Sequence, residues 1–189
     1  MISTMKKLLR VFAVVVPIAV LVLINFGWAV CHQYGEMNGL LLDAKDGKPI
    51  QGAAVVGVYL IEHGTVGGEV DESVDARETT TDSGGRFLLP GKLVCVPRLP
   101  FSGFSKQPRI YIFAPNYESV FVWKAQAYQG KVYEFRVSRL ETDNARKGNA
   151  AGVVVYEPAA IAAKFPNFLN LVNAERRKYG MPEIYVRKQ

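Results

Sequence analysis

Few residues in this chain could bind a metal or move a proton. Its 189 residues include two histidines, His32 and His63, and two cysteines, Cys31 and Cys95. A zinc site built from these four would need ligands paired at a Cys-x-x-Cys or His-x-x-x-His spacing, and neither spacing occurs. With only two histidines, a His-centred acid–base pair is not expected either. The sequence predicts no bound metal and no other cofactor.

The sequence patterns of common hydrolases and nucleotide-binding enzymes are also missing. There is no Gly-x-Ser-x-Gly nucleophile elbow and no glycine-rich phosphate loop. Four acids lie close together, but they lack the Asp-x-Asp-x-Asp-Gly spacing and terminal Glu of a calcium loop. These acids are Glu69, Asp71, Glu72 and Asp75. The sequence therefore predicts no catalytic residues, and the chain is not expected to be an enzyme.

Residues 1–30 predict export from the cytoplasm. Three basic residues precede an apolar run over residues 11–24, and small residues follow at Gly27 and Ala29. This order is typical of a secretory signal peptide cleaved after Ala29. The alternative is an uncleaved transmembrane anchor, because residues 11–30 are long enough to cross the hydrocarbon core. Either way, the rest of the chain is expected to be extracytoplasmic, membrane-anchored or secreted.

The two cysteines leave three alternatives open. Outside the cytoplasm, Cys31 and Cys95 would more often form a disulfide than a reactive site. They could also remain two unpaired thiols. A lipid-modified Cys31 is the third alternative, although the large side chains of Trp28 and Val30 depart from the usual lipoprotein signal.

The middle of the chain has the pattern of an all-β protein. Seven short segments rich in β-branched and aromatic residues are bounded by turn residues, which is typical of an antiparallel sandwich. These segments are residues 39–43, 53–61, 77–81, 86–89, 109–113, 118–123 and 131–137. Between them, the acidic, glycine-containing residues 62–76 are expected to be a solvated connection. Residues 90–108 contain four prolines and are expected to be a loop.

From residue 141 the composition changes. Residues 141–148 are polar and are expected to be irregular. A short helix is predicted over residues 159–164, and a longer one over 168–179 with Asn167 as its N-cap. The basic residues at the end of the second helix suit the helix dipole. Residues 141–189 are therefore predicted to form a small C-terminal helical appendage.

Three segments resemble the carboxypeptidase regulatory-like domain family, whose fold is similar to that of transthyretin. They are Gly39-Leu-Leu-Leu-Asp43, Gly47-Lys-Pro-Ile-Gln-Gly-Ala-Ala-Val55 and Thr79-Thr-Thr-Asp-Ser-Gly-Gly-Arg-Phe87. The later Pro108-Arg-Ile-Tyr-Ile and Pro115-Asn-Tyr117 also look like a strand and turn of this family. The resemblance covers residues 36–140. It implies a seven-stranded, prealbumin-like antiparallel sandwich in a secreted or surface protein, without catalytic residues of its own.

The metal-binding His-x-x-Glu pair of zinc carboxypeptidases is missing after both histidines. The leading functional prediction is a non-catalytic structural or protein-interaction module at the cell envelope. Its expected partners are the membrane, through residues 11–30 if they are uncleaved, and an envelope protein or glycan. Nucleic acid is not expected, because the net charge of +6 comes with no basic run interleaved with aromatic residues. The alternative is a carbohydrate- or peptide-binding module that uses Phe101, Phe104, Tyr111 and Trp123.

Overall fold

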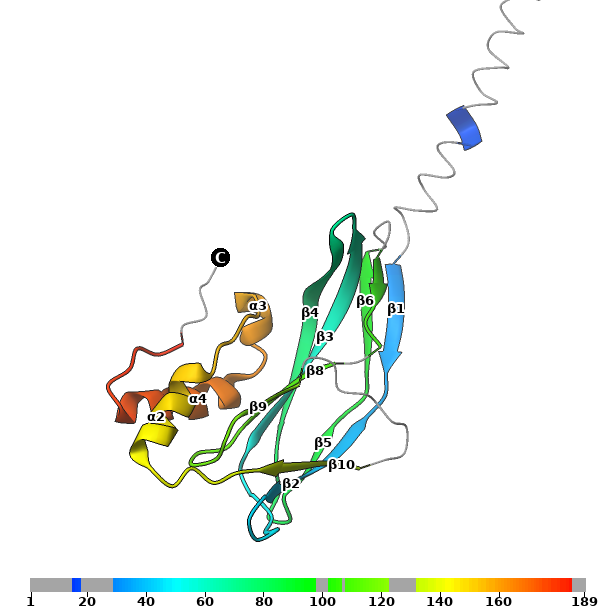
Figure 1. The fold of residues 1–189 in the computed structure, drawn as a ribbon. Coiled ribbons are helices and arrows are strands. Elements are labelled where there is room, and N and C mark those ends of the chain that lie inside the picture. Colours follow the sequence, from blue (N-terminus) through cyan, green and yellow to red (C-terminus); the bar gives the residue numbers. More distant parts are fainter. Residues whose placement is uncertain (1–14, 18–28, 98–101, 107, 123–131, 185–189) are drawn as a thin grey trace, which may run out of the picture.

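The computed structural model describes residues 15–17, 29–97, 102–106, 108–122 and 132–184, and within them the protein is mostly β with several sheets (Figure 1). The strands are β1 (Ala29–Tyr34), β2 (Met37–Asp43), β3 (Ala54–Thr65), β4 (Gly68–Thr80), β5 (Arg86–Leu89), β6 (Lys92–Pro97), β7 (Ser102–Phe104), β8 (Arg109–Phe113), β9 (Val120–Val122) and β10 (Tyr133–Val137). The helices that follow are α2 (Asp143–Gly152), α3 (Ala159–Ala162) and α4 (Pro166–Lys178). No helix in the described part of the chain is long and apolar enough to cross a membrane. The predicted signal or anchor over residues 1–30 falls outside the described residues, except for 15–17 and 29–30.

Each of the seven predicted strand segments lies at least partly in a strand, namely β2, β3, β4, β5, β8, β9 and β10. Three further strands occur in regions where the sequence predicted none. The prediction of an irregular connection over residues 62–76 is wrong, because they complete a long β3–β4 hairpin, although residues 64–70 at its tip are exposed to solvent as predicted. The prediction of a loop over residues 90–108 is wrong as well, since it contains β6 and β7. Residues 62–76 pair with each other and with the rest of β3 across a tight turn, whereas β6 and β7 pair with the distant strands β1 and β3.

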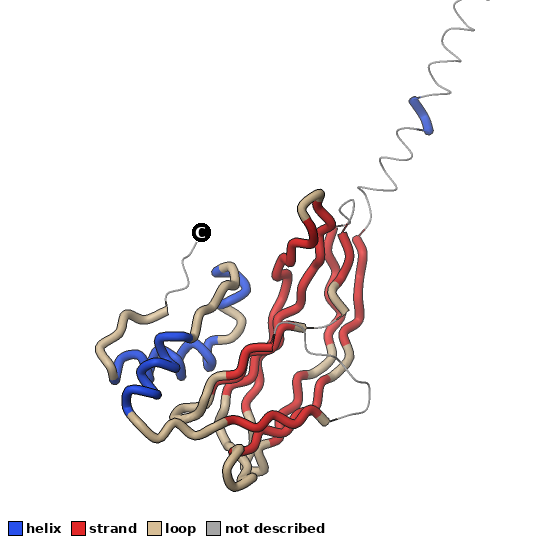
Figure 2. Tube along the Cα trace, viewed as in Figure 1, coloured by secondary structure: helices blue, strands red, loops and turns tan. Residues whose placement is uncertain are grey.

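The strands form two main sheets and a two-stranded ribbon. One sheet has the order β10-β2-β5, and the other has the order β4-β3-β8-β9 with β7 also paired to β3. Strands β10 and β2 pair in parallel, so the prediction of a purely antiparallel sandwich is wrong for this pair. The two strands are far apart in the chain, so no tight turn holds them antiparallel. The ribbon of β1 and β6 continues the β2–β5 pair across a bend at residues 35–36 and 90–91 (Figure 2). Gly91 permits this bend, because a Cβ atom there would lie 2.9 Å from the carbonyl oxygen of Tyr34.

Residues 54–61 of β3 and all of β8 are buried on both faces, which explains the nearly continuous apolar runs over residues 54–61 and 110–113. Val55, Ile110 and Ile112 pack toward Leu41 and Phe87 of the β10-β2-β5 sheet. The alternate residues of β3 and β8 point to the opposite face and pack against the helices. They include Val56, Val58, Tyr111 and Phe113.

The pairing of β2 and β5 depends on two glycines. Gly39 lies directly opposite Phe87, whose ring occupies the space of the missing side chain, since a Cβ atom there would lie 2.0 Å from the ring. Gly85 has a φ of 70°, and a Cβ atom there would lie 2.5 Å from the carbonyl oxygen of Leu41. The carboxylate of Asp82 accepts hydrogen bonds from the backbone of Gly84 and Arg86, at 2.9 and 2.8 Å. These residues determine the turn and the strand register.

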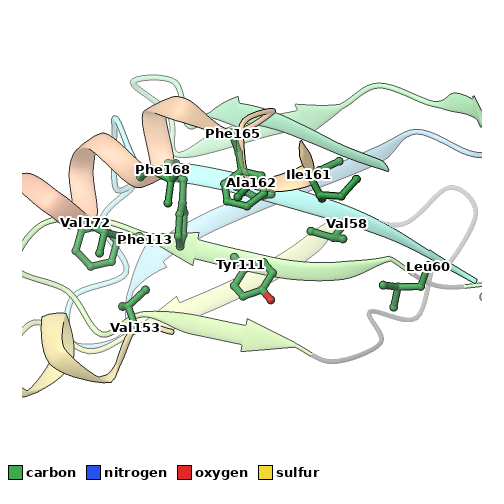
Figure 3. Close-up of a cluster of buried hydrophobic side chains, with 14 residues drawn as sticks. Val58, Leu60, Tyr111, Phe113, Val153, Ile161, Ala162, Phe165, Phe168 and Val172 are labelled. Atoms are coloured by element: carbon green, nitrogen blue, oxygen red, sulfur yellow. The ribbon is translucent and has the colours of Figure 1, made fainter. Parts of the chain in front are cut away.

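The helices cover the outer face of the β4-β3-β8-β9 sheet (Figure 3). Ile161, Phe165, Phe168 and Val172 pack with the outward side chains of β3 and β8. The predicted C-terminal helices are present, but they are part of the folded core and not a separate appendage. A sequence window cannot show this, because the apolar partners of the helices lie more than 40 residues earlier in the chain.

The prediction of an irregular segment over residues 141–148 is also wrong, since α2 occupies most of it. Its N-cap is Thr142, whose hydroxyl accepts a hydrogen bond from the backbone N–H of Ala145 at 3.2 Å. Helix α4 begins earlier than predicted, with Pro166 in its first turn in place of an Asn167 cap.

Three carboxylates attach the helical layer to the sheet. Glu157 lies before α3, and its buried carboxylate accepts hydrogen bonds from Arg109 at 2.7 Å and from the Tyr111 hydroxyl at 2.8 Å. Glu78 of β4 accepts hydrogen bonds from backbone N–H groups in the first turn of α4. Asp75 of β4 forms ion pairs with Lys164 of the helical layer and Lys92 of β6.

We expect Phe168→Ala to lower the free energy of unfolding by about 3–5 kcal/mol, because the buried ring leaves a cavity between α4 and the sheet. Urea denaturation measures the change. Asn170→Ala, on the exposed side of the same helix, should change it by less than about 0.5 kcal/mol. Equal effects of the two substitutions would contradict the packing of α4 on the sheet.

Asp75 makes stability depend on pH. Burial alone would raise its pKa, but the hydrogen bonds from Lys164 and Lys92 outweigh burial and lower the pKa below its ordinary value. The ionised carboxylate therefore stabilises the fold above its unfolded pKa of about 4, and this contribution is lost as the pH falls through the folded pKa. We expect Asp75→Asn to destabilise the protein at pH 7 and to converge with the wild type in acid. Urea denaturation at several pH values, with the exposed Glu69→Gln as control, checks this; a pH-independent difference would contradict it.

Candidate ligand-binding site

A cavity of about 470 Å³ lies where the β1–β6 ribbon bends away from the β10-β2-β5 sheet. Residues 32–37 line one side of the cavity. Strand β3, the segment before β8 and the first residue of β10 line the rest. Its lining is His32, Gln33, Tyr34, Gly35, Glu36, Met37, Gly57, Tyr59, Leu89, Lys106, Pro108 and Tyr133. A volume of this size is typical of a small-molecule site.

The deep part of the cavity is apolar. Met37, Gly57, Leu89 and Pro108 are all buried, and none has a polar side-chain atom. We call these four residues the apolar floor. The backbone of Gly57 is paired on both sides, with Arg77 of β4 and Ile110 of β8, so the sheet uses its hydrogen-bonding groups.

The floor is open because residue 57 is a glycine within the β-branched run of β3. A Cβ atom at Gly57 would lie 3.2 Å from Leu89 Cδ1 and 3.7 Å from Ile110 Cδ1. A larger side chain at this position would therefore occupy the space above Leu89. This glycine inside a buried strand is the sequence signal that could have indicated the cavity.

The outer part of the cavity is polar. Gln33, Glu36 and Lys106 are exposed, and we call these three residues the polar rim. Glu36 accepts a hydrogen bond from the Asn38 side chain at 3.3 Å. The rim thus carries one negative and one positive charge, which lie outside the floor and remain accessible to solvent.

Packed aromatic side chains line the cavity beside the floor. The Tyr34 hydroxyl donates its proton to the carbonyl oxygen of Ser105 at 2.9 Å and shares it with that of Leu60 at 3.2 Å. Its ring lies 4.5 Å from that of Tyr59 and 4.6 Å from that of His32, measured between centroids. Burial raises the pKa of Tyr34 to about 12, so the hydroxyl stays protonated and donates at neutral pH.

Cys31 and Cys95 form a disulfide, with an S–S distance of 2.06 Å. The sequence left this pairing open among three alternatives. The two residues are directly opposite each other on β1 and β6, and both are exposed. The bond closes a separation of 64 residues and ties β1, which lines the cavity, to β6.

The structure does not gather the predicted aromatic site into one surface. Phe104 lies on β7 and stacks on His32, with the ring centroids 5.5 Å apart. Tyr111 is buried on the opposite face of the same sheet, against the helices. Phe101 and Trp123 lie outside the described residues. Phe104 is therefore the one member of the predicted set that is placed near the cavity wall.

The two histidines and two cysteines do not form one site. Both cysteines are in the disulfide, and His63 contacts Glu72 across the β3–β4 hairpin at 2.8 Å. Within the described part of the chain, no group of three or more His, Cys, Asp or Glu side chains is arranged to hold a metal ion.

No protein-family model matches this chain, and no curated protein matches it. Among solved structures, a 9R-lipoxygenase from Cyanothece PCC8801 aligns with 12% sequence identity and a TM-score of 0.31. The alignment covers 77% of this chain and 24% of the lipoxygenase chain. A similarity of this size indicates neither a shared fold nor a shared activity.

We expect the double substitution Cys31→Ser and Cys95→Ser to lower the free energy of unfolding by about 2–4 kcal/mol, because the unfolded chain loses a long covalent loop. Denaturation with and without reductant measures the effect. Reductant should destabilise the wild type to a similar extent and leave the double variant unchanged. A wild type that is insensitive to reductant, with its thiols shown to be reduced, would contradict this role.

Proposed function

We propose that this chain is a non-catalytic, extracytoplasmic β-sandwich module that binds a ligand or partner at the cell envelope. The observation that carries the proposal is the cavity at the ribbon bend, with its apolar floor and polar rim. The module would act by presenting this cavity on a rigid, disulfide-tied scaffold. It would be held near the membrane through residues 11–30 if they are uncleaved, or released as a secreted domain.

Two observations support an extracytoplasmic location. Disulfides persist in oxidising compartments, and the Cys31–Cys95 bond joins exposed positions that the cytoplasm would keep reduced. Residues 1–30 have the order of basic, apolar and small residues that directs export.

The packing of the two main sheets supports the proposed prealbumin-like sandwich. An apolar core lies between them, with Leu41 and Phe87 on one side and Val55 and Ile112 on the other. We propose a relationship to the carboxypeptidase regulatory-like domains, based on the turn and strand segments of residues 39–87. The helical layer and the long β3–β4 hairpin would be additions to that compact form.

The buried charged residues form ion pairs within the fold, which supports a binding role over a catalytic one. Glu157, Arg109 and Asp75 are committed to ion pairs that hold the helices and β6 in place. None of these residues lines the cavity. The charged groups that do line it, Glu36 and Lys106, are exposed and suit recognition at the rim.

A carbohydrate or peptide ligand is the second candidate. The half-buried rings of His32, Phe104 and Tyr133 favour it, because rings beside a cavity can stack on a sugar or on an aromatic side chain.

Site-specific photo-crosslinking tests the binding role. A photoreactive residue at position 106 of the full chain, exported in a bacterial host, is expected to capture an envelope component. The same residue at position 45, an exposed lysine in the β2–β3 turn, should capture much less. Introducing Gly57→Val should abolish the adduct from position 106, because the new side chain meets Leu89. Equal adducts from both positions, or none from either, would overturn the proposal.

A further inference from the structure

We infer that the cavity binds a single-chain amphiphile, with its apolar body on the floor and its anionic head at Lys106. This inference rests on the proposed binding role and specifies the chemistry of the ligand. It follows from the position of the polar groups around the cavity, from the volume and from the charges of the rim.

The floor favours an apolar group over a sugar. The side chains of Met37, Leu89 and Pro108 offer no hydrogen-bond partner, and the backbone at Gly57 is occupied by its neighbouring strands. The Tyr34 hydroxyl beside the floor already donates to carbonyl oxygens, and the Tyr59 hydroxyl is the one other polar side-chain group on a buried lining residue. A sugar has several hydroxyls, and those that do not reach Tyr59 would lose their bonds to water here without replacement. An acyl chain or a fused-ring body has no hydrogen bonds to water to lose.

The volume suits a body larger than one ring. An apolar cavity of roughly 150 Å³ accommodates benzene. The cavity at the bend, at about 470 Å³, has room for a medium-length acyl chain or two fused rings. Burying such a body removes its apolar surface from water, which favours binding.

The rim determines which head group is favoured. Lys106 and Glu36 are both exposed, so a charged head can pair with one of them while remaining hydrated. Asn38 donates to one oxygen of the Glu36 carboxylate at 3.3 Å, whereas among the described residues no hydrogen bond or ion pair reaches the Lys106 ammonium, so Lys106 is the rim charge most available to a new partner. A carboxylate or phosphate head therefore fits the rim better than a cationic head does.

The test uses the full chain in lipid nanodiscs and two photoreactive probes. One is dodecanoate with a diazirine on its chain, and the other is a diazirine-tagged disaccharide. Peptide mass spectrometry measures labelling of β2 and β5, which carry Met37 and Leu89. We expect dodecanoate to label these strands and the disaccharide not to label them. Gly57→Val should reduce dodecanoate labelling at least fivefold. Gly103→Val, where a side chain meets open space, should leave it unchanged.

The head-group assignment has its own variants. Lys106→Glu should weaken labelling by the anionic probe about fivefold and strengthen labelling by a trimethylammonium analogue of the same chain length. Lys45→Glu makes the same change of charge on another exposed surface, and it should alter neither. Because position 106 is exposed, this variant keeps the test valid even where Gly57→Val fails to fold.

The outcomes separate the inference from the proposed function. Labelling of β2 and β5 by the disaccharide alone, sensitive to Gly57→Val, would overturn the amphiphile and leave the binding role standing. Dodecanoate labelling that Lys106→Glu does not alter would overturn the assignment of the anionic head. Absence of labelling by every probe, together with no adduct from position 106 in cells, would overturn both.

Discussion

The whole protein depends on two central strands that are buried on both faces. Strand β3 pairs with β4 on one edge and β8 on the other, while its alternate side chains enter two different cores. Val55 and Val56, neighbours in sequence, therefore stabilise different layers of the molecule. A sheet in this position cannot exchange apolar for polar residues on either face without leaving a buried group unsatisfied. This constraint explains why the helices are integral to the fold, since without them one face of β3 and β8 would be exposed.

The helical layer is also positioned by charge. Apolar packing is not directional, but Glu157 reaches Arg109 and Tyr111 in only one placement of the segment before α3. Such a buried pair contributes little net stability, because desolvation opposes the attraction between the charges. Breaking it by removing one partner is costly, since an unpaired charge would stay buried. The pair is therefore better understood as determining where the helices sit than as the source of their stability.

The cavity lies where the bent β1–β6 ribbon and strand β3 diverge. The β1–β6 ribbon follows β2 and β5 up to the bend and then turns, while β3 continues behind it with a shift in its register to β4 at Tyr59 and Leu60. Tyr34 and Tyr59 pack against each other beside the cavity, and Gly57 adds no side chain to it. The disulfide lies farther along the same ribbon and holds β1 against β6. The binding site and the bend thus have one structural origin.

The sequence by itself determined the seven strand segments of residues 39–137, the turn at Asp82 to Gly85 and the presence of helix α4. These features depend on local alternation and turn residues, which act over a few positions. The tertiary structure alone decided the pairing of β6 with β1 and of β7 with β3, and the union of the helices with the sheet. It also decided the cavity, because Met37, Gly57 and Leu89 are each about 20 or more residues apart in the chain. Their contact depends on the bend of a ribbon across another sheet, which no local pattern records.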